Sequence, residues 1–236
     1  MVAVVFIASF TVGPWQTTCY LVGPAPGGPC VVIDPGVGAS GPLADVVAEH
    51  HLEPAGVLLT HGHVDHMFTA AEACERWDIG CWIDDADRHW LTDPYLLPGA
   101  RELVAAALGE APDFTDREPA EVHGVVAGEP ITLADLTFTP YGAPGHTPGS
   151  TMFALDHPED PSLSPLVFCG DVVFAGSVGR TDLPGGDPQV MAATLRDVVL
   201  ALPDTAVLLP GHGPQTLMSR ERATNPYLRD VGLLSS

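Results

Sequence analysis

The feature that most constrains this chain is a cluster of metal-ligand side chains directly after a short apolar run. Residues 61–66 read His-Gly-His-Val-Asp-His, which places three imidazoles and one carboxylate in six positions. His61 and His63 lie two positions apart and can point the same way from an extended turn. Asp65 and His66 follow on the next bend and aim at a second point nearby. The spacing predicts two adjacent metal ions, and a polar loop of structural histidines is the alternative.

Three further residues of ligand type occur later, each beside a glycine and after a strand-like run or turn. They are His146 in Pro144–Gly149, Asp171 after Gly170, and His212 between Gly211 and Gly213. Glycine has no side chain, so a loop can turn tightly there and approach a metal closely. Taken singly, each residue is more typical of an ordinary loop or turn. Together with residues 61–66, they form a set of seven.

In this order the motifs resemble those of the metallo-β-lactamase superfamily, and the similarity covers nearly the whole chain. The segments that carry it are Val31–Gly36, residues 60–66, Pro144–Gly149, Gly170–Asp171 and Gly211–Gly213. The resemblance implies an α/β fold, an αββα sandwich of two mixed β-sheets flanked by helices. It also implies a set of metal ligands, namely His61, His63 and His146 for one metal and Asp65, His66 and His212 for the other, with Asp171 bridging them. Asp34 matches a position that supports the metal loop through hydrogen bonds.

Within the superfamily, the chain is most similar to the short hydroxyacylglutathione hydrolase-like (glyoxalase II-like) proteins, through Gly179–Asp187 and Arg220–Leu228. The resemblance implies hydrolysis of a thioester, an S-(2-hydroxyacyl)glutathione or an analogous thiol conjugate, by a hydroxide that bridges two metals. It further implies that Arg180 binds the substrate, because a guanidinium offers paired donors to a carboxylate. A structural ion pair of Arg180 with Asp182 or Asp187 is the alternative.

Two departures from full-length glyoxalase II count against glutathione itself as the thiol carrier. Gly213-Pro214 stands where the full-length enzyme usually has Glu-Tyr, so a tyrosine that helps to bind the thiol is missing. Only 24 residues follow His212, so the helical domain that supplies further glutathione contacts is not expected. The sequence therefore predicts the hydrolytic centre and leaves the thiol carrier open.

The charges of the predicted centre suit thioester chemistry. Two divalent cations, the carboxylates of Asp65 and Asp171, and one hydroxide sum to about +1, which would stabilise an oxyanion. The two carboxylates would orient the nucleophile, and a leaving thiol with a pKa near 8.5 departs with little help from an acid. Two divalent ions, Zn²⁺ first, are expected, although Fe or Mn would suit these ligands too.

Other activities remain open on the same scaffold. The main rival is a persulfide dioxygenase, which would hold one iron through His61, His146 and Asp171 by position. Lactonase or β-lactamase activity, and a role in metal or partner binding without catalysis, are further alternatives.

Composition narrows the class of partner. The 236 residues form one domain without a linker or repeat, and their formal charge of −21 disfavours unaided binding to nucleic acid. The apolar segment at 1–10 is too short to span a bilayer and lacks a basic start, so no membrane association is expected. Five scattered cysteines without CxxC spacing indicate free core thiols and a cytoplasmic location. A small-molecule thioester is thus the expected partner, and the oligomeric state is open.

The pattern of apolar residues and turn residues predicts strands and helices in alternation. Strands are expected at 2–10, 18–23, 30–34, 56–60, 79–83, 131–140, 151–155, 166–170 and 206–209, and helices at 42–51, 67–77, 101–108 and 188–201. Residues 84–120 interrupt the pattern and are expected to form an insertion that covers the site. Its aromatics could line a substrate pocket or form a hydrophobic contact of their own, while Asp84, Asp85 and Asp87 are expected on a solvated face.

Overall fold

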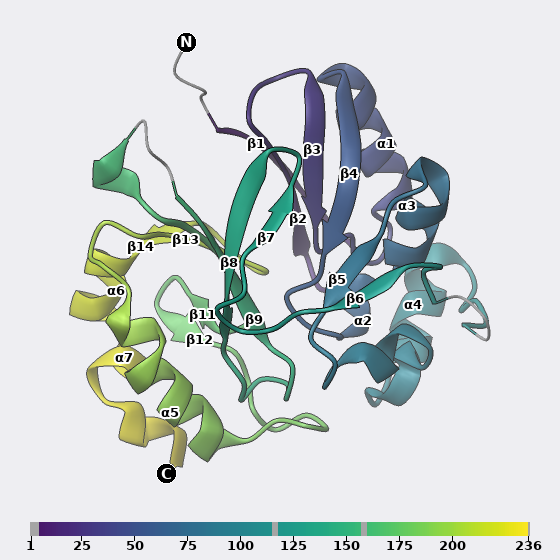
Figure 1. Cartoon of the computed structure of the whole chain (residues 1–236). Coiled ribbons are helices and arrows are strands. Elements are labelled where there is room, and N and C mark those ends of the chain that lie inside the picture. The colour runs from purple at the N-terminus through teal and green to yellow at the C-terminus, as the bar shows by residue number, and fades with distance from the viewer. Residues whose placement is uncertain (1–4, 115–117, 157–159, 236) are drawn as a thin grey trace.

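The computed structural model describes residues 5–114, 118–156 and 160–235, and it contains two six-stranded sheets packed face to face between helical layers (Figure 1). Residues 2–4 of the first expected strand and 115–117 of the expected insertion lie outside the described residues. The expected αββα sandwich of two mixed sheets is confirmed.

The first sheet uses the N-terminal half of the chain, in the order β1-β2-β3-β4-β5-β6. Its strands are β1 (Phe6–Val12), β2 (Thr17–Gly23), β3 (Gly28–Ile33), β4 (Leu52–Leu58), β5 (Cys81–Ile83) and β6 (Val122–Gly124). The first three strands are antiparallel neighbours, and β3 to β6 run parallel. Parallel neighbours need crossover connections, and α1 (Ser40–Glu49) and α3 (Ala70–Trp77) supply the first two.

The second sheet has the order β14-β13-β10-β9-β8-β7, and in it only β10 and β13 pair in parallel among the described residues. Its strands are β7 (Ile131–Leu133), β8 (Leu136–Gly142), β9 (Thr151–Leu155), β10 (Leu166–Gly170), β13 (Val207–Pro210) and β14 (Thr216–Leu217). The single strand expected at 131–140 is wrong. Ala134 and Asp135 have φ of 52° and 59°, so the chain turns back there as a hairpin.

The remaining elements lie around the sheets. They are the hairpin β11 (Val173–Phe174) and β12 (Ser177–Val178), the helices α2 (Val64–Met67), α4 (Ala100–Leu108), α5 (Pro188–Asp197), α6 (Met218–Thr224) and α7 (Pro226–Arg229), and the 3₁₀ turns η1 (Arg88–Leu91), η2 (Pro94–Leu96), η3 (Pro161–Leu163), η4 (Val199–Ala201) and η5 (Val231–Ser235). α5 begins as predicted, because Asp187 accepts hydrogen bonds from the backbone of Gln189 and Val190. The helix expected at 67–77 starts later, at Ala70 in α3, and the separate short helix α2 before it ends at Met67.

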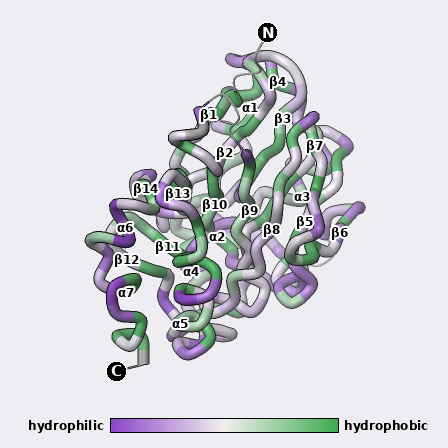
Figure 2. Tube along the Cα trace, turned by 60° about the vertical axis from the view of Figure 1, so that its left-hand side comes forward, coloured by the Kyte–Doolittle hydropathy of each residue, from purple (hydrophilic) through white to green (hydrophobic). Residues whose placement is uncertain are grey.

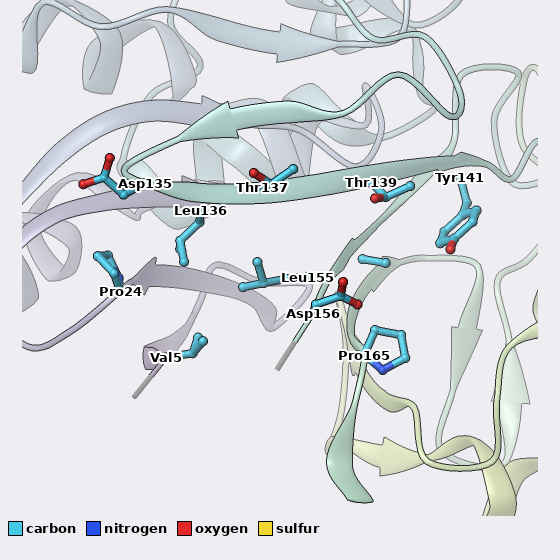
Figure 3. Close-up of a pocket in the computed structure, with 11 residues that line it drawn as sticks. Val5, Pro24, Asp135, Leu136, Thr137, Thr139, Tyr141, Leu155, Asp156 and Pro165 are labelled. Carbon is cyan, nitrogen blue, oxygen red and sulfur yellow. The ribbon is translucent and has the colours of Figure 1, made fainter. Parts of the chain in front are cut away.

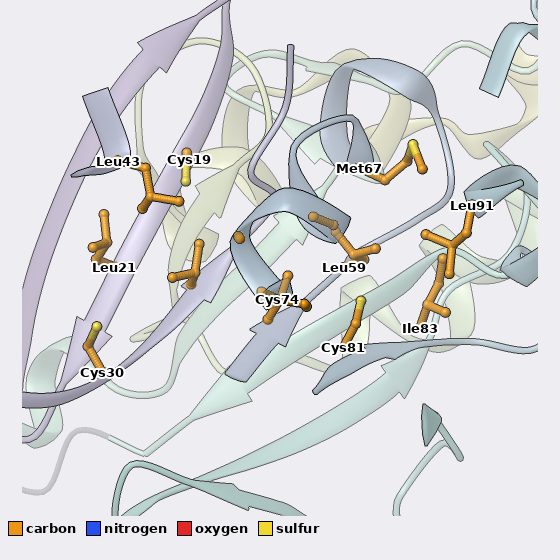
Figure 4. Packing of buried hydrophobic residues seen from close by; sticks show 14 of the residues in the cluster. Cys19, Leu21, Cys30, Leu43, Leu59, Met67, Cys74, Cys81, Ile83 and Leu91 are labelled. Atoms are coloured by element: carbon orange, nitrogen blue, oxygen red, sulfur yellow. The ribbon is translucent and has the colours of Figure 1, made fainter. Parts of the chain in front are cut away.

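The inner strands are largely apolar, as Figure 2 shows, and three of the buried clusters lie on or between the two sheets. Phe138, Phe153 and Phe168 pack between the sheets, and each such burial contributes about 1.5–3 kcal/mol. A second cluster joins the first sheet to α1 and α3 (Figure 4). A third joins the second sheet to α5. All five cysteines are buried and free, as expected for core thiols. Among the described residues we find no helix long and apolar enough to cross a bilayer.

Candidate metal centre

The metal loop leaves the sandwich after β4 and enters α2. His61 and His63 precede the helix and are buried, whereas Asp65 and His66 lie within it. The cause is local, because His63 has extended backbone (φ −61°, ψ 143°) and the helix starts at Val64. The two pairs of side chains therefore project to two neighbouring points, in the way that the spacing predicts.

Three histidines from both halves of the chain converge on the first point. The Nε2 atom of His61 lies 3.2 Å from Nδ1 of His63, and Nε2 of His146 lies 2.9 Å from the same Nδ1 atom. Nitrogens bound tetrahedrally to one Zn²⁺ at about 2.0–2.1 Å would be about 3.3 Å apart. These three imidazoles could therefore hold one metal ion.

A second set converges beside the first. The Nε2 atom of His212 lies 3.3 Å from Oδ2 of Asp65 and 3.4 Å from Nε2 of His66, and the latter lies 3.5 Å from Oδ2 of Asp65. All three separations are close to the edge of a tetrahedral metal site. His66 is fully buried, whereas the side chain of His212 is 26% exposed and lies at the open side of the centre.

Asp171 lies between the two sets. Its Oδ2 atom is 3.5 Å from Nε2 of His146 and 3.3 Å from Nε2 of His212, and its Oδ1 atom is 3.3 Å from Nε2 of His66. Among the described residues, Oδ1 is buried without a hydrogen-bond partner. Such an oxygen is costly unless a cation or a donor satisfies it. The donor set therefore fits two metal ions with this carboxylate between them.

Two histidines of the first metal set, His61 and His63, are held in the protonation state that metal binding requires. Burial, together with neighbouring imidazoles, lowers the pKa of His61 well below its usual value and that of His63 to about 3. Burial opposes the ionisation of Asp65 and Asp171, but the imidazoles of the second set outweigh it and lower the pKa of both carboxyl groups. Neutral imidazoles and ionised carboxylates are therefore available at neutral pH.

The histidines of the second set have raised rather than lowered pKa values. Burial disfavours the protonated forms of His66 and His212, but the facing carboxylates outweigh burial. They raise the pKa of His66 well above its usual value and that of His212 to about 9. In the metal-free protein these imidazoles are protonated at neutral pH and balance Asp65 and Asp171. A metal ion would take the place of those protons.

Hydrogen bonds behind the ligands fix their orientation. Asp34 is buried, accepts hydrogen bonds from the backbone N–H and hydroxyl of Thr60 at 2.8 and 2.6 Å, and lies 2.9 Å from Nδ1 of His66. This is the supporting position that the sequence predicts for it. Thr17 donates to Oδ2 of Asp65 at 2.8 Å. Such partners select the tautomer of a ligating histidine and hold its ring.

Two glycines let separate loops meet at the centre. A Cβ atom on Gly211 would lie 2.4 Å from Cε1 of His66 and 2.6 Å from Oδ1 of Asp171. Gly170 has φ of +48°, and a Cβ atom there would lie 2.4 Å from the Thr60 hydroxyl. Side chains at these positions would push the ligand loops apart.

Arg180 contributes through its backbone, which sequence reasoning missed. Its carbonyl oxygen lies 2.7 Å from Nδ1 of His146 and accepts the proton of that nitrogen when Nε2 faces a metal. Its side chain is 61% exposed and makes a bidentate ion pair with Asp182, at 2.6 and 2.7 Å. The geometry is that of the structural turn that the sequence offered as the alternative to substrate binding.

The insertion packs against the metal loop through Trp90, which is 2% exposed and makes an edge-to-face contact with His63. The aromatic side chain of Trp90 therefore makes a buried contact with the metal loop. The expected solvated position of Asp87 is wrong, because this residue is fully buried. Its carboxylate accepts hydrogen bonds from the backbone of Gly62 and Gly149 and from the hydroxyl of Thr147. It thereby links the loop of His61 and His63 to the loop of His146. The aspartates at 84–87 give no indication in the sequence that one of them has this role.

Sequence reasoning also missed a second buried hydrogen-bond network, although Glu221 and Asn225 in it belong to Arg220–Leu228, a segment that carries the family resemblance. Glu221 is fully buried and accepts hydrogen bonds from Thr216, from Asn225 and from the backbone of Gly176. Asn225 donates to the carbonyl of Ser177 at 2.9 Å. The network anchors the β11–β12 hairpin, which follows Asp171 and places Phe174 beside His212 with ring centroids 6.0 Å apart.

A cavity of about 350 Å³ lies at the other ends of the strands, away from the ligands (Figure 3). Its lining includes Val5, Pro24, Leu155 and Pro165, from the start of β1, the end of β2, the end of β9 and the approach to β10. The ligand loops leave the opposite strand ends. We therefore place the candidate active site at the histidine and aspartate centre.

Comparison with known proteins agrees with this geometry. A family model described as the metallo-beta-lactamase superfamily matches residues 12–212. An uncharacterized protein of Mycobacterium tuberculosis is 37% identical over 95% of this chain and 98% of its own length. The hydroxyacylglutathione hydrolase GloC of Haemophilus influenzae is 29% identical over 84% of this chain and 86% of its own length.

Solved structures with the same fold include a B3 metallo-beta-lactamase, BLEG-1, with a TM-score of 0.78 and 30% identity over 94% of this chain and 99% of that chain. A second, TTHA1623, was solved in a di-iron-bound form and has a TM-score of 0.73 and 34% identity over 93% of this chain and 99% of that chain. The first of these proteins is thus described as a β-lactamase, and the second is described by the two irons that it binds.

Proposed function

Because the chain belongs to the metallo-β-lactamase superfamily, whose model matches residues 12–212, we propose that it is a dinuclear metal-dependent hydrolase that cleaves a thioester. The observation that carries the proposal is the position of Asp171 between two convergent ligand sets. His61, His63 and His146 would hold one ion, and Asp65, His66 and His212 the other.

Two divalent ions there would polarise an acyl oxygen and lower the pKa of water towards about 7, so that a nucleophile exists at neutral pH. Side chains and backbone groups of the protein would orient the water and the metal ligands. Asp65 and Asp171 stay ionised, because the imidazoles of the second set lower the pKa of both carboxyl groups, and they can accept a hydrogen bond that orients the attacking water. Asp34 and the carbonyl of Arg180 hold the rings of His66 and His146 while charge develops.

Among acyl substrates, thioesters need the fewest catalytic groups beyond those that this site provides. A thiolate with a pKa near 8.5 leaves without a strong general acid, whereas an amine or alkoxide needs one. The similarity to the GloC hydroxyacylglutathione hydrolase points to S-(2-hydroxyacyl)glutathione or an analogous thiol conjugate. We propose Zn²⁺ as the metal. Fe and Mn suit the same ligands, and TTHA1623 was solved with two irons.

The persulfide dioxygenase is the second candidate, since one iron on His61, His146 and Asp171 would suffice for it. We favour hydrolysis because Gly211-His212-Gly213 and Asn225-Pro226-Tyr227 resemble the short hydrolase group more closely. A partner of low molecular weight suits this site better than nucleic acid does, because the chain carries a formal charge of −21.

The test is thiol release from S-lactoylglutathione by metal-analysed protein, with and without added Zn²⁺, Fe²⁺ and Mn²⁺. Metal-dependent release is the expected result, at a stoichiometry of two ions per chain. Oxygen consumption with glutathione persulfide, without any thiol release by the fully metal-loaded protein, would instead assign the dioxygenase reaction.

A further inference from the structure

We propose that Phe174 is a specificity-determining residue, an aromatic side chain beside the metal centre against which the acyl group of the thioester packs. The proposal rests on the thioester hydrolysis proposed above and deepens it, because the protein should then prefer 2-hydroxyacyl groups with a large apolar substituent. Three observations carry it: the contact of Phe174 with His212, its position outside the apolar clusters, and the hydrogen bonds that fix its backbone.

Phe174 lies against the most accessible of the seven expected metal ligands. Its ring centroid is 6.0 Å from that of His212, and the two ring planes are inclined by 69°. The side chain of His212 is 26% exposed, whereas Asp65 and Asp171 are 10% and 11% exposed and the other four histidines are buried. A substrate that reaches the centre from its accessible side would therefore meet Phe174.

Phe174 is not a member of the hydrophobic core. Val173, which precedes it in β11, is fully buried in the cluster that joins the second sheet to α5. Successive side chains of a strand point to opposite faces, so Phe174 faces away from that cluster. It is half-buried and belongs to none of the four apolar clusters that the described residues form. Its ring is therefore available for contact with a ligand.

The buried network of Glu221 and Asn225 holds the backbone around Phe174 in place. The Nδ2 atom of Asn225 donates to the carbonyl oxygen of Phe174 at 3.4 Å and to that of Ser177 at 2.9 Å. Glu221 accepts a hydrogen bond from the backbone N–H of Gly176 at 2.7 Å. These bonds fix both strands of the β11–β12 hairpin, so little further ordering is needed when a substrate packs against the ring.

The acyl group is the part of the proposed substrate that suits an aromatic surface. In an S-(2-hydroxyacyl)glutathione the thiol carrier is a charged peptide, and burying its amides and carboxylates beside a ring without hydrogen-bond partners costs free energy. The acyl carbon has to reach the metals, so its side group lies next to the ligands. An apolar side group there would gain free energy by packing on Phe174.

The experiment compares S-lactoyl and S-mandeloyl thioesters, which are both 2-hydroxyacyl esters and carry a methyl or a phenyl side group. Each is prepared on glutathione and on N-acetylcysteamine, so that the result does not depend on the thiol carrier. The measured quantity is kcat/KM for the mandeloyl ester divided by kcat/KM for the lactoyl ester, with metal-loaded protein. We expect Phe174→Ala to lower this ratio about fivefold, the size of one aromatic contact. The intrinsic reactivity of the esters cancels when the two proteins are compared.

A binding measurement gives a second readout that involves no turnover. Mandelate and lactate are the acyl products of the two esters, and titration calorimetry on metal-loaded protein measures the Kd of each. We expect mandelate to bind about fivefold more tightly than lactate to the wild-type protein, and Phe174→Ala to abolish this difference.

Phe6→Ala is the matched control. Phe6 is a half-buried phenylalanine on β1, and its ring centroid is 5.0 Å from that of His50, a histidine outside the metal sets. This variant should leave the kcat/KM ratio and both Kd values unchanged. Metal content and Tm are measured for each protein. If Phe174→Ala does not fold, Phe174→Leu replaces it and should lower the ratio about twofold, because leucine is apolar but lacks an aromatic face.

The outcomes separate this inference from the proposed function. A lower ratio in Phe174→Ala at unchanged metal content, with Phe6→Ala like the wild type, supports the inference. Cleavage of both esters with an unchanged ratio, or an equal loss of activity on both, overturns it and leaves thioester hydrolysis standing. Cleavage of none of the four esters by fully metal-loaded wild-type protein overturns thioester hydrolysis and the inference with it.

Discussion

Replacing Asp87 by Asn tests whether the insertion holds the two metal loops together. The Oδ2 atom of Asp87 accepts hydrogen bonds from the backbone of Gly62 at 2.9 Å and from the hydroxyl of Thr147 at 2.6 Å, and Oδ1 accepts from Gly149 at 2.8 Å. An amide keeps one acceptor oxygen and turns an NH₂ group towards a donor. At least one buried donor then loses its partner and faces another donor.

The magnitude follows from the number of bonds affected. Leaving one or two buried donors unsatisfied costs about 1–3 kcal/mol each, so we expect a loss of about 2–4 kcal/mol in the free energy of unfolding. For a domain of 236 residues this corresponds to a fall in Tm of about 4–8 °C. Because His61, His63 and His146 flank the tethered positions, metal affinity should also fall by about 10–100-fold.

The assay is chemical and thermal denaturation of metal-free and metal-loaded protein, with metal affinity measured by chelator competition. Asp85→Asn is the matched control, because Asp85 is an exposed neighbour, and it should change stability by less than about 0.5 kcal/mol. If Asp87→Asn matched this control in both stability and metal affinity, the tethering role would be refuted.

Three further predictions concern the centre and its supports. Asp171→Ala should abolish activity and lower metal content, and a variant that kept both, as read by metal analysis and thiol release, would remove the bridging role. The metal-free protein should lose stability as pH rises from about 6.5 towards about 9, because the pKa of His212 is raised to about 9 and its protonated form stabilises the fold below that range. Metal affinity should rise over the same range, and titration calorimetry in buffers of different ionisation enthalpy should detect proton release on binding at pH 7. Glu221→Gln should lower the free energy of unfolding by about 2–3 kcal/mol in denaturant titrations, whereas the exposed Glu129→Gln should not.

Much of the centre could be predicted because its chemistry is local in the chain. His61, His63, Asp65 and His66 fall within six positions, and the end of β4 and the start of α2 separate them into two pairs by backbone geometry alone. The later ligands each follow a strand or turn beside glycine, so their residue types and order were visible too. The fold class followed from the same motifs through the family resemblance.

What the sequence did not reveal is which polar groups become buried. Asp84, Asp85 and Asp87 have the same side chain within four positions, yet only Asp87 among them is fully buried. Arg180 likewise carries a guanidinium that suits a substrate, but its carbonyl faces His146 and its side chain pairs with Asp182.

The sequence by itself determined the ligand types and their spacing, because these depend on neighbours in the chain, and it predicted a two-metal centre from them. The αββα scaffold followed from the family resemblance that the same motifs carry. Only the tertiary structure decided that Asp87 and Glu221 are internal anchors. Their hydrogen-bond partners lie up to 62 and 45 residues away. Burial and pairing at such separations depend on how the sheets and the insertion pack, and no local pattern encodes them.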